Sequence, residues 1–346
     1  MRRLSACIRA PGLRSPGRRR HAVTALAGLS LTMIVAGCNL PGTSAATSSG
    51  TETTVTVAVV PGIDNAALAL AQKNGLFTSA GIKVKIRSFA TVTSEIAALS
   101  SGAVDVAAGD YGDLFFAQAT APHPIYRIIA DGYDAVPGVL EIMTLPSSHI
   151  TSPTQLARQK IAAPAIGRVL TPTDAPDSLD IATATSVLQS FGVNLSVVHW
   201  ENMTPTAELR ALSEGQVQAI LVTEPYIYLA QRNLGAVELV DACSGATATI
   251  PLSGYFTTAS WSRDNSTAVA AFRSGLSQAA ADASMPGPLQ AVLHGYAGLT
   301  AQEAALVTVG TYPISTIAAN LQRTADMMNT EGMIRFRLNV AAMIVP

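Results

Sequence analysis

The sequence predicts an α/β fold made of two similar lobes. Strand and helix signals alternate along the chain after residue 54, and one short pattern of residues occurs twice. Hydrophobic residues make up 49% of the 346 residues, which is enough to bury a sizeable core. A βαβα order favours a mostly parallel sheet that is covered by helices.

The elements of the first lobe follow from apolar runs and their breakers. Pro61-Gly62 ends the first apolar run, and Asp64 or Asn65 can cap the helix after it. Gly75 and Gly102 can each close a helix. The predicted elements are a strand over Val55 to Val60, a helix over Ala66 to Asn74, an alternating strand over Ile82 to Arg87, a helix around Ser94 to Ser100 and a strand over Val104 to Ala108.

The repeated pattern is A-L-S-x-G-x-V, which begins at Ala98 and again at Ala211. It describes a helix end, a glycine cap and a buried strand, so it predicts one supersecondary unit used once in each lobe. Chance is the alternative in a chain so rich in alanine. An acid and an aromatic residue follow each copy, at Asp110-Tyr111 and at Glu224-Pro225-Tyr226. Ligands of open α/β sheets bind beyond the carboxyl ends of strands, where both pairs fall.

The first 37 residues have the pattern of an export signal. Seven arginines and no acid lie among them, followed by the short apolar stretch from Ala22 to Ala36. The segment Val35-Ala36-Gly37-Cys38 resembles the bacterial lipobox, which implies cleavage before Cys38 and lipidation of its thiol. An ordinary secretory signal with an incidental cysteine is the alternative. Both the general secretory and the twin-arginine routes of export fit the arginine-rich start.

Residues 38–53 are predicted to be a lipidated flexible tether, because Ser, Thr, Ala and Gly there cannot bury enough apolar area to offset chain entropy. All 23 acidic residues follow Cys38 but only 15 of the 22 basic residues do, which leaves a mature net charge of −8. Such an acidic chain is a poor nucleic-acid binder. We expect a monomer on the extracytoplasmic face of the cell membrane, anchored in the lipid bilayer through acylated Cys38.

Several short segments, taken in order, resemble the solute-binding lipoproteins of ABC importers, in the group that handles nitrate, sulfonates, taurine and thiamine-precursor pyrimidines. The segments are Ala69-x-x-x-x-Gly75-Leu76-Phe77 leading to Gly81-Ile82-Lys83-Val84, Leu99-x-x-Gly102-x-Val104-Asp105, Leu156-Ala157-x-x-Lys160-Ile161-Ala162, Glu224-Pro225-Tyr226 and Leu321-Gln322-x-x-Ala325-Asp326-x-Met328-x-x-x-Gly332. The resemblance covers nearly the whole mature chain.

This resemblance implies a type II periplasmic-binding-protein fold, in which two α/β lobes close on a solute like a hinged clamp. Residues 54–141 and 254–346 would form the first lobe, and residues 144–240 the second. Two crossing strands near 139–144 and 237–241 would join them. The implied partners are an ABC permease and its ATPase, with no cofactor, no metal and no chemistry on the ligand.

The resemblance also implies that the solute touches loops after the strands and the N-termini of helices. The ligand-binding candidates are Asp64, Asn65, Thr91, Thr93, Ser94, Asp110, Tyr111, Arg168, Glu224 and Tyr226. Three carboxylates and one guanidinium favour a neutral or amine-bearing solute over a sulfonate or nitrate. Tyr111 or Tyr226 would stack on such a solute if it is heteroaromatic.

Structural roles compete with these assignments. Asp64 can be only a helix cap, Asp110 and Asp113 solvated loop acids, and Glu224 an internal hydrogen-bond partner. Trp200 can line the mouth of the second lobe or lie in its core.

Other function classes find less support in the residues. His123, His149, His199 and His294 lie apart, without the spacing of metal ligands. Cys243 with a distant histidine could serve a secreted hydrolase, although a small buried residue is the simpler interpretation. A lipid-anchored sensor with the same fold is a further alternative to transport.

Overall fold

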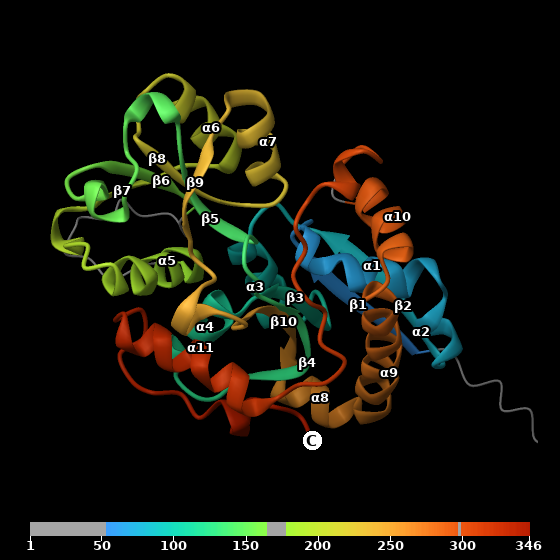
Figure 1. Cartoon of the computed structure of the whole chain (residues 1–346). Helices are drawn as coiled ribbons and strands as arrows, with labels where there is room; N and C mark the ends of the chain where they lie inside the picture. Colours follow the sequence, from blue (N-terminus) through green and yellow to red (C-terminus); the bar gives the residue numbers. More distant parts are fainter. Residues whose placement is uncertain (1–52, 165–177, 297–298) are drawn as a thin grey trace, which may run out of the picture. The chain divides into compact units, whose positions relative to one another are not determined.

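The computed structural model describes residues 53–164, 178–296 and 299–346. These residues belong to one compact unit, Gly50–Pro346. Strands and helices alternate, and the described strands form two sheets of five strands each (Figure 1). The predicted α/β class is confirmed.

The first sheet has the strand order β2-β1-β3-β10-β4. β1 runs parallel to both β2 and β3, whereas β10 is antiparallel to β3 and to β4. The five strands are β1 (Thr53–Val59), β2 (Ile82–Ser88), β3 (Val106–Asp110), β4 (Tyr126–Asp134) and β10 (Pro251–Thr258).

The second sheet repeats this arrangement with the order β7-β6-β8-β5-β9. β6 runs parallel to β7 and β8, and β5 is antiparallel to β8 and β9. The strands are β5 (Leu140–Thr144), β6 (Lys160–Ala163), β7 (His199–Asn202), β8 (Ala219–Thr223) and β9 (Val237–Asp241). The two sheets therefore share one topology, in which β3 of the first corresponds to β8 of the second.

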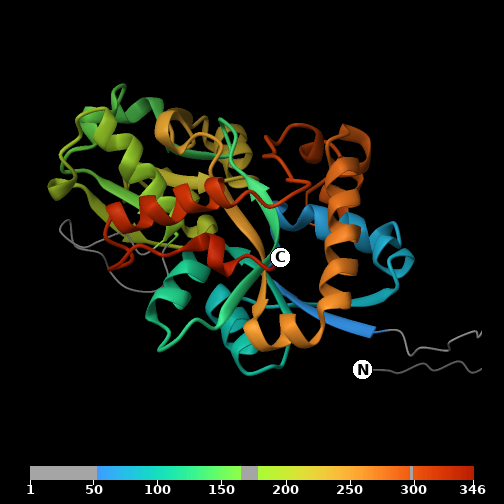
Figure 2. The same cartoon turned by 90° about the horizontal axis from the view of Figure 1, so that it is seen from below.

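The helices pack against the sheets and against one another. α9 runs beside α1 and α2, as Figures 1 and 2 both show, and α11 packs on α4 and α5. The α-helices are α1 (Ala66–Lys73), α2 (Leu76–Ser79), α3 (Val92–Ser100), α4 (Tyr111–Thr120), α5 (Leu179–Ser190), α6 (Pro205–Ser213), α7 (Tyr226–Leu234), α8 (Ala259–Asp264), α9 (Ser266–Ala283), α10 (Pro286–Tyr296) and α11 (Ala318–Thr330). Short 3₁₀ turns are η1 (Ile63–Asn65), η2 (Pro146–Ser148), η3 (Pro153–Leu156), η4 (Leu195–Val197), η5 (Gly245–Thr247), η6 (Glu303–Ala305) and η7 (Val340–Met343).

Within the described part of the chain, the buried apolar residues form two hydrophobic clusters. The larger contains the first sheet, its helices and part of the second sheet with α5. The smaller lies between the second sheet and the helices α6 and α7, around Met143, Leu212 and Ile220. Trp200 lies in β7, is buried and belongs to the larger cluster, which supports the core interpretation of this residue.

The two connections between the sheets lie next to the segments that were expected to join the lobes. The chain leaves the first sheet after Asp134 and enters the second at Leu140, then leaves after Asp241 and returns at Pro251. The expected crossings, 139–144 and 237–241, coincide mainly with β5 and β9, which pair with each other in the second sheet. The lobe boundaries and the position of a hinge stay predictions.

Two local details differ from the expectations. Asn65 is the N-cap of α1 by position, but its side chain makes no capping hydrogen bond there. A separate short helix, α2, follows Gly75, which has the left-handed φ of 67° that glycine tolerates best. No helix within the described ranges is long and apolar enough to cross a membrane.

Candidate functional site

The predicted site residues of the first lobe gather at one edge of the first sheet. β1, β2 and β3 are parallel, so their carboxyl ends face the same way. Each of these ends leads into a helical turn: β1 into η1 with Asp64, β2 into α3, and β3 into α4. Backbone direction alone therefore brings Asp64, the start of α3 and Asp110 to one edge.

Asp64 and Asn65 form a small hydrogen-bonded unit. The Asn65 side-chain nitrogen donates to the Val60 carbonyl at 3.1 Å and to Asp64 Oδ1 at 3.2 Å. Burial raises the pKa of Asp64 to about 6, and a hydrogen bond from the Ser253 side chain partly opposes that rise. Asn65 is buried and has these internal partners, so it braces the loop, whereas Asp64 is only partly buried.

Thr91, Thr93 and Ser94 form the exposed first turn of α3. Thr91 Oγ1 accepts a hydrogen bond from the Ser94 backbone N–H at 3.2 Å, and Ser94 Oγ donates to the Thr91 carbonyl at 2.7 Å. Thr91 is thus a helix cap of the usual kind. The three hydroxyls are accessible, and the structure gives Thr93 no further role.

Asp110 caps α4 by accepting hydrogen bonds from the backbone N–H groups of Gly112 and Asp113. Burial raises its pKa well above the usual range, and the nearby carboxyls of Asp113 and Asp180 raise it further. A Cβ on Gly112 would lie 2.9 Å from Leu179 Cβ, which shows that the first turns of α4 and α5 touch.

Tyr111 has no exposed surface, and its ring stacks on Phe115 with the centroids 5.4 Å apart. Its hydroxyl donates to Asp131 Oδ1 at 2.9 Å. The expectation that a solute stacks on Tyr111 is therefore wrong, because the ring is an internal part of the core.

Glu224 follows β8 at the corresponding edge of the second sheet. Its carboxylate accepts hydrogen bonds from the backbone N–H groups of Tyr228 and Thr308, both at 3.1 Å. Burial raises the pKa of Glu224, and these two hydrogen bonds oppose the rise. Glu224 is thus an internal hydrogen-bond partner that ties the start of α7 to the segment after η6. Tyr226 is half-buried against the smaller core cluster.

Arg168 and Cys38 lie outside the described residues. Cys243 is fully buried, and burial raises the pKa of its thiol well above the usual range, so the thiolate that a nucleophile requires is disfavoured.

Two glutamates that were not predicted share one structural position. Glu95 lies in the first turn of α3 and Glu208 in the first turn of α6, and both are 0% exposed. The signal was present in the sequence: the repeat extends to T-x-T-x-E-x-x-A-L-S-x-G-x-V, from Thr91 and from Thr204. Each glutamate N–H donates to the carbonyl of its threonine, at 3.2 Å for Glu95 and 2.9 Å for Glu208.

The Glu95 carboxyl lies against the carboxyl ends of β1 and β3. Its oxygens are 3.4 and 3.5 Å from the place that a Cβ on Gly109 would take. Burial and then the Asp64 carboxyl raise the pKa of Glu95 to about 9, whereas nearby backbone N–H groups of Ala108 and Val60 lower it by less. Neither carboxyl oxygen has a partner that meets the usual hydrogen-bond geometry among the described residues.

Glu208 is the corresponding buried carboxyl of the second sheet, where α6 packs on β6 and β8. Burial and then the Asp180 carboxyl raise its pKa to about 9, and neither of its oxygens has a hydrogen-bond partner in the described part of the chain. Asp180, in the first turn of α5, is itself affected by Asp64, and its pKa is raised to about 6. Carboxyls of both sheets therefore lie close enough to influence one another.

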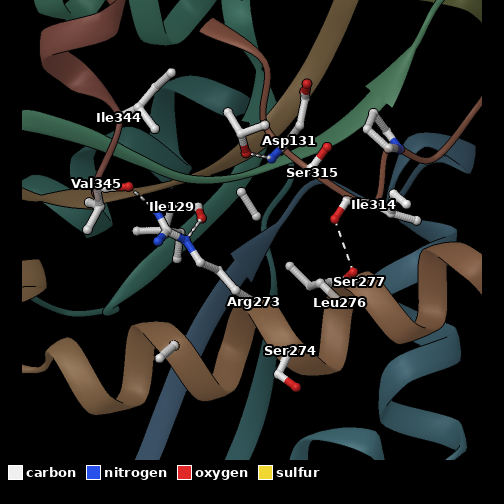
Figure 3. A pocket seen from close by; sticks show the side chains of 14 residues that line it. Ile129, Asp131, Arg273, Ser274, Leu276, Ser277, Ile314, Ser315, Ile344 and Val345 are labelled. Carbon is white, nitrogen blue, oxygen red and sulfur yellow. Dashed lines mark hydrogen bonds between the residues drawn. The ribbon is translucent and has the colours of Figure 1, made fainter.

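A cavity of about 460 Å³ lies between β4, α9 and the C-terminal segment, outside this region (Figure 3). Arg273 points into it and donates hydrogen bonds to the backbone carbonyls of Ile129, Val345 and Pro346. None of the predicted ligand-binding residues lines this cavity. The guanidinium fixes the end of the chain.

The model of the NMT1/THI5-like family matches residues 63–291. No curated protein matches the chain.

Several solved structures are similar in fold. The periplasmic aliphatic sulphonate-binding protein SsuA of Escherichia coli has 19% identity and a TM-score of 0.68, with 85% of this chain and 92% of that one covered. The periplasmic nitrate-binding protein NrtA of Synechocystis PCC 6803 has 14% identity and a TM-score of 0.57, with 72% and 68% covered. The desulfurization enzyme DSZB has 15% identity and a TM-score of 0.62, with 85% and 96% covered. These likenesses confirm the type II periplasmic-binding-protein fold.

Proposed function

The chain belongs to the NMT1/THI5-like family, and from that premise we propose that it is the extracytoplasmic solute-binding component of an ABC importer. The observation that carries the proposal is the duplicated sheet. Two sheets with the same strand order carry polar residues at the carboxyl ends of their parallel strands. That edge is where α/β proteins bind ligands, and SsuA and NrtA, which share the fold, are described as binding proteins.

In this proposal a small organic solute enters between the two lobes and is held by hinged closure. The Glu224 carboxylate already links the second sheet to Thr308, and Arg232 of α7 pairs with Glu303 of η6 at 3.1 Å. Such contacts between lobes can form on closing and break on opening, so a solute that touches both lobes shifts the equilibrium towards the closed state. The closed state is then delivered to a permease with its ATPase.

The solute preference rests on charge. Asp64, Asp110, Asp180, Glu95 and Glu208 are carboxyls near these edges, and burial raises the pKa of each. In its ionised form such a desolvated acid repels a sulfonate or a nitrate and accepts hydrogen bonds from N–H groups. A neutral or amine-bearing solute fits this environment better than an anion, and Tyr226 is the aromatic candidate that still has exposed surface.

The cellular setting belongs to the same proposal. The leader of residues 1–37 directs export, and Cys38 carries the lipid that holds a monomer to the membrane through the tether of residues 38–53. Mass spectrometry of the protein from membranes tests this point, because it should find the leader removed and residue 38 acylated.

Catalysis is the competing class, because the fold is shared with the desulfurization enzyme DSZB. The fully buried Cys243 argues against a thiol hydrolase. Turnover of ester or amide substrates that is lost in Cys243→Ala would overturn this assignment.

A thermal-shift screen of the full chain in detergent tests the function itself, with amines, pyrimidines, sulfonates and nitrate as candidate solutes. A ligand at 100 times its Kd adds about 2.7 kcal/mol to the free energy of unfolding, which is easily seen as a higher melting temperature. A shift by one class and not the others supports a binding protein. No shift from any of the four classes would contradict the proposal.

A further inference from the structure

The strand β2 carries three basic side chains on one face. β2 lies at one end of the first sheet, with β1 as its neighbour (Figure 1). Side chains alternate along a strand, and here Ile82 and Val84 are buried whereas Lys83, Lys85 and Arg87 are exposed. These three exposed residues are called the basic face below.

The charge of the basic face is not neutralised by the fold. None of its three cations forms an ion pair with another residue in the described ranges. Arg87 donates to the Ala103 carbonyl at 2.9 Å, and its guanidinium lies 5.4 Å from the centroid of the Phe89 ring, so the group is held in place but keeps its charge. Asp105 lies beyond β1, where its carboxylate accepts the Thr56 N–H at 2.7 Å.

The surrounding sequence is basic in an otherwise acidic protein. Residues 65–94 contain four basic residues and no acid, whereas the chain from Cys38 onward has 15 basic and 23 acidic residues. Edge strands often carry a lysine, because it discourages pairing with another sheet. That role does not require acids to be absent from thirty consecutive residues. The charge pattern therefore points to an anionic partner for this face.

The predicted tether joins the fold next to the basic face. Thr53 is the first residue of β1 and pairs with Ile82, the first residue of β2. At about 3.4 Å per residue, Arg87 lies about 17 Å along the strand from that junction. A flexible chain with the length and composition of residues 38–53 has a reach of about 20 Å. A membrane that holds the start of this tether is therefore within reach of all three cations.

We propose that the basic face docks on the anionic lipid headgroups of the membrane that holds Cys38. This inference rests on the proposed lipid anchor and goes beyond solute capture. Ammonium and guanidinium groups donate charge-assisted hydrogen bonds to headgroup phosphates. The tether makes docking intramolecular, with an effective concentration on the order of millimolar, so weak contacts are sufficient. Each cation at an anionic membrane raises the docked population about fivefold.

Acetylation of lysines tests the proposal on the protein purified from membranes and reconstituted into vesicles. Phosphatidylcholine vesicles are compared with vesicles that also contain phosphatidylglycerol, at low salt, with a neutral reagent and mass spectrometry. The chain has four lysines, at positions 73, 83, 85 and 160. Lys83 and Lys85 should react at least threefold more slowly in the anionic vesicles. The difference should vanish in NaCl of about 0.5 M, where the Debye length is about 4 Å.

Lys160 is the internal control for these rates. It lies in β6 of the second sheet, its side chain is 55% exposed, and it pairs with Glu201 at 3.0 Å. Its rate of acetylation should be the same in both kinds of vesicle.

Two matched variants separate the basic face from the net charge of the protein. Lys85→Gln removes one cation of the face, so it should remove most of the protection of Lys83. Lys160→Gln removes the same charge from the second sheet and should leave the protection of Lys83 unchanged. Both residues are exposed, and a surface ion pair such as that of Lys160 contributes little stability. Both variants should therefore melt at the wild-type temperature.

The outcomes distinguish this inference from the solute-binding proposal. Rates for Lys83 and Lys85 that are equal in the two kinds of vesicle, or an equal slowing at Lys160, would overturn docking by the basic face. Slowing in neutral vesicles that grows with protein density would assign the face to a second copy of the chain, which also overturns lipid docking. An unmodified Cys38 would overturn docking together with the anchor. None of these results changes the outcome of the thermal-shift screen for solutes.

Discussion

Replacing Glu208 by glutamine should make the stability of the protein less dependent on pH. The pKa of Glu208 is raised from 4.5 to about 9 by burial and by Asp180. Between these values the folded protein keeps a proton that the unfolded chain has released. The free energy of unfolding therefore falls as pH rises through this window, and the stabilising contribution is fully present only below about pH 4.5.

The size of the effect follows from this proton. One proton that is held only by the folded state changes the free energy of unfolding by about 1.4 kcal/mol per pH unit. Over the two units from pH 6 to pH 8, the raised pKa of Glu208 alone lowers the free energy of unfolding by about 3 kcal/mol. This is a large share of the total free energy of unfolding of a domain, which is typically about 5–15 kcal/mol. Glu208→Gln should remove this part of the loss, and Glu95→Gln should do the same through its own raised pKa.

Urea unfolding followed by tryptophan fluorescence measures this dependence at constant ionic strength. Trp200 is buried in β7 of the second sheet, so its emission reports on that part of the fold. Glu214→Gln, an exposed neighbour on the same helix, should lose as much stability between pH 6 and pH 8 as the wild type. Equal losses in wild type and Glu208→Gln would refute the reasoning, because they would mean that the carboxyl is already ionised in the folded protein.

Three further substitutions test the packing around the site, each by urea unfolding at pH 6. Tyr111→Phe removes the hydroxyl that donates to Asp131 at 2.9 Å. It should lower the free energy of unfolding by about 1–3 kcal/mol without changing solute affinity. Weaker solute binding with unchanged stability would return Tyr111 to the ligand site. Gly254→Ala should lower the free energy of unfolding by about 1–3 kcal/mol or more, because the new Cβ would lie 2.2 Å from the Tyr111 hydroxyl. Unchanged stability would mean that the Tyr111 ring can move aside. Glu224→Gln keeps one acceptor oxygen for two N–H groups and should cost about 1–2 kcal/mol, with faster hydrogen exchange at Thr308. Unchanged exchange at Thr308 would contradict a stabilising hydrogen bond from its N–H to Glu224.

The fold could be predicted because apolar runs and their breakers are local signals. The strand predicted over 55–60 is β1 (Thr53–Val59), residues 82–87 lie in a strand as predicted, and the helices around 66–74 and 94–100 were correctly located. The short helix α2 was missed because four residues are too few to show a helical period. The repeat placed a common unit in both halves, and the two sheets share one strand order.

The side chains of the site were harder to predict, because burial depends on tertiary packing. Asp110 and Tyr111 are neighbours in sequence, yet one caps a helix and the other lies in the core. Glu95 and Glu208 were missed because a glutamate beside hydroxyl-bearing residues in a first helical turn has the pattern of a solvated helix start. The repeat A-L-S-x-G-x-V begins with apolar residues, and the glutamate common to both copies lies three residues before its first alanine.

Hydrogen exchange with and without solute tests the central claim that both lobes hold one ligand. The experiment uses the full chain with the candidate that raises the melting temperature most. Amide protection should rise at the edges of both sheets, in residues 60–65 and 109–113 of the first and in residues 204–208 and 224–228 of the second. Protection confined to one of these sheets, or absent while the ligand is bound, would contradict capture between two lobes.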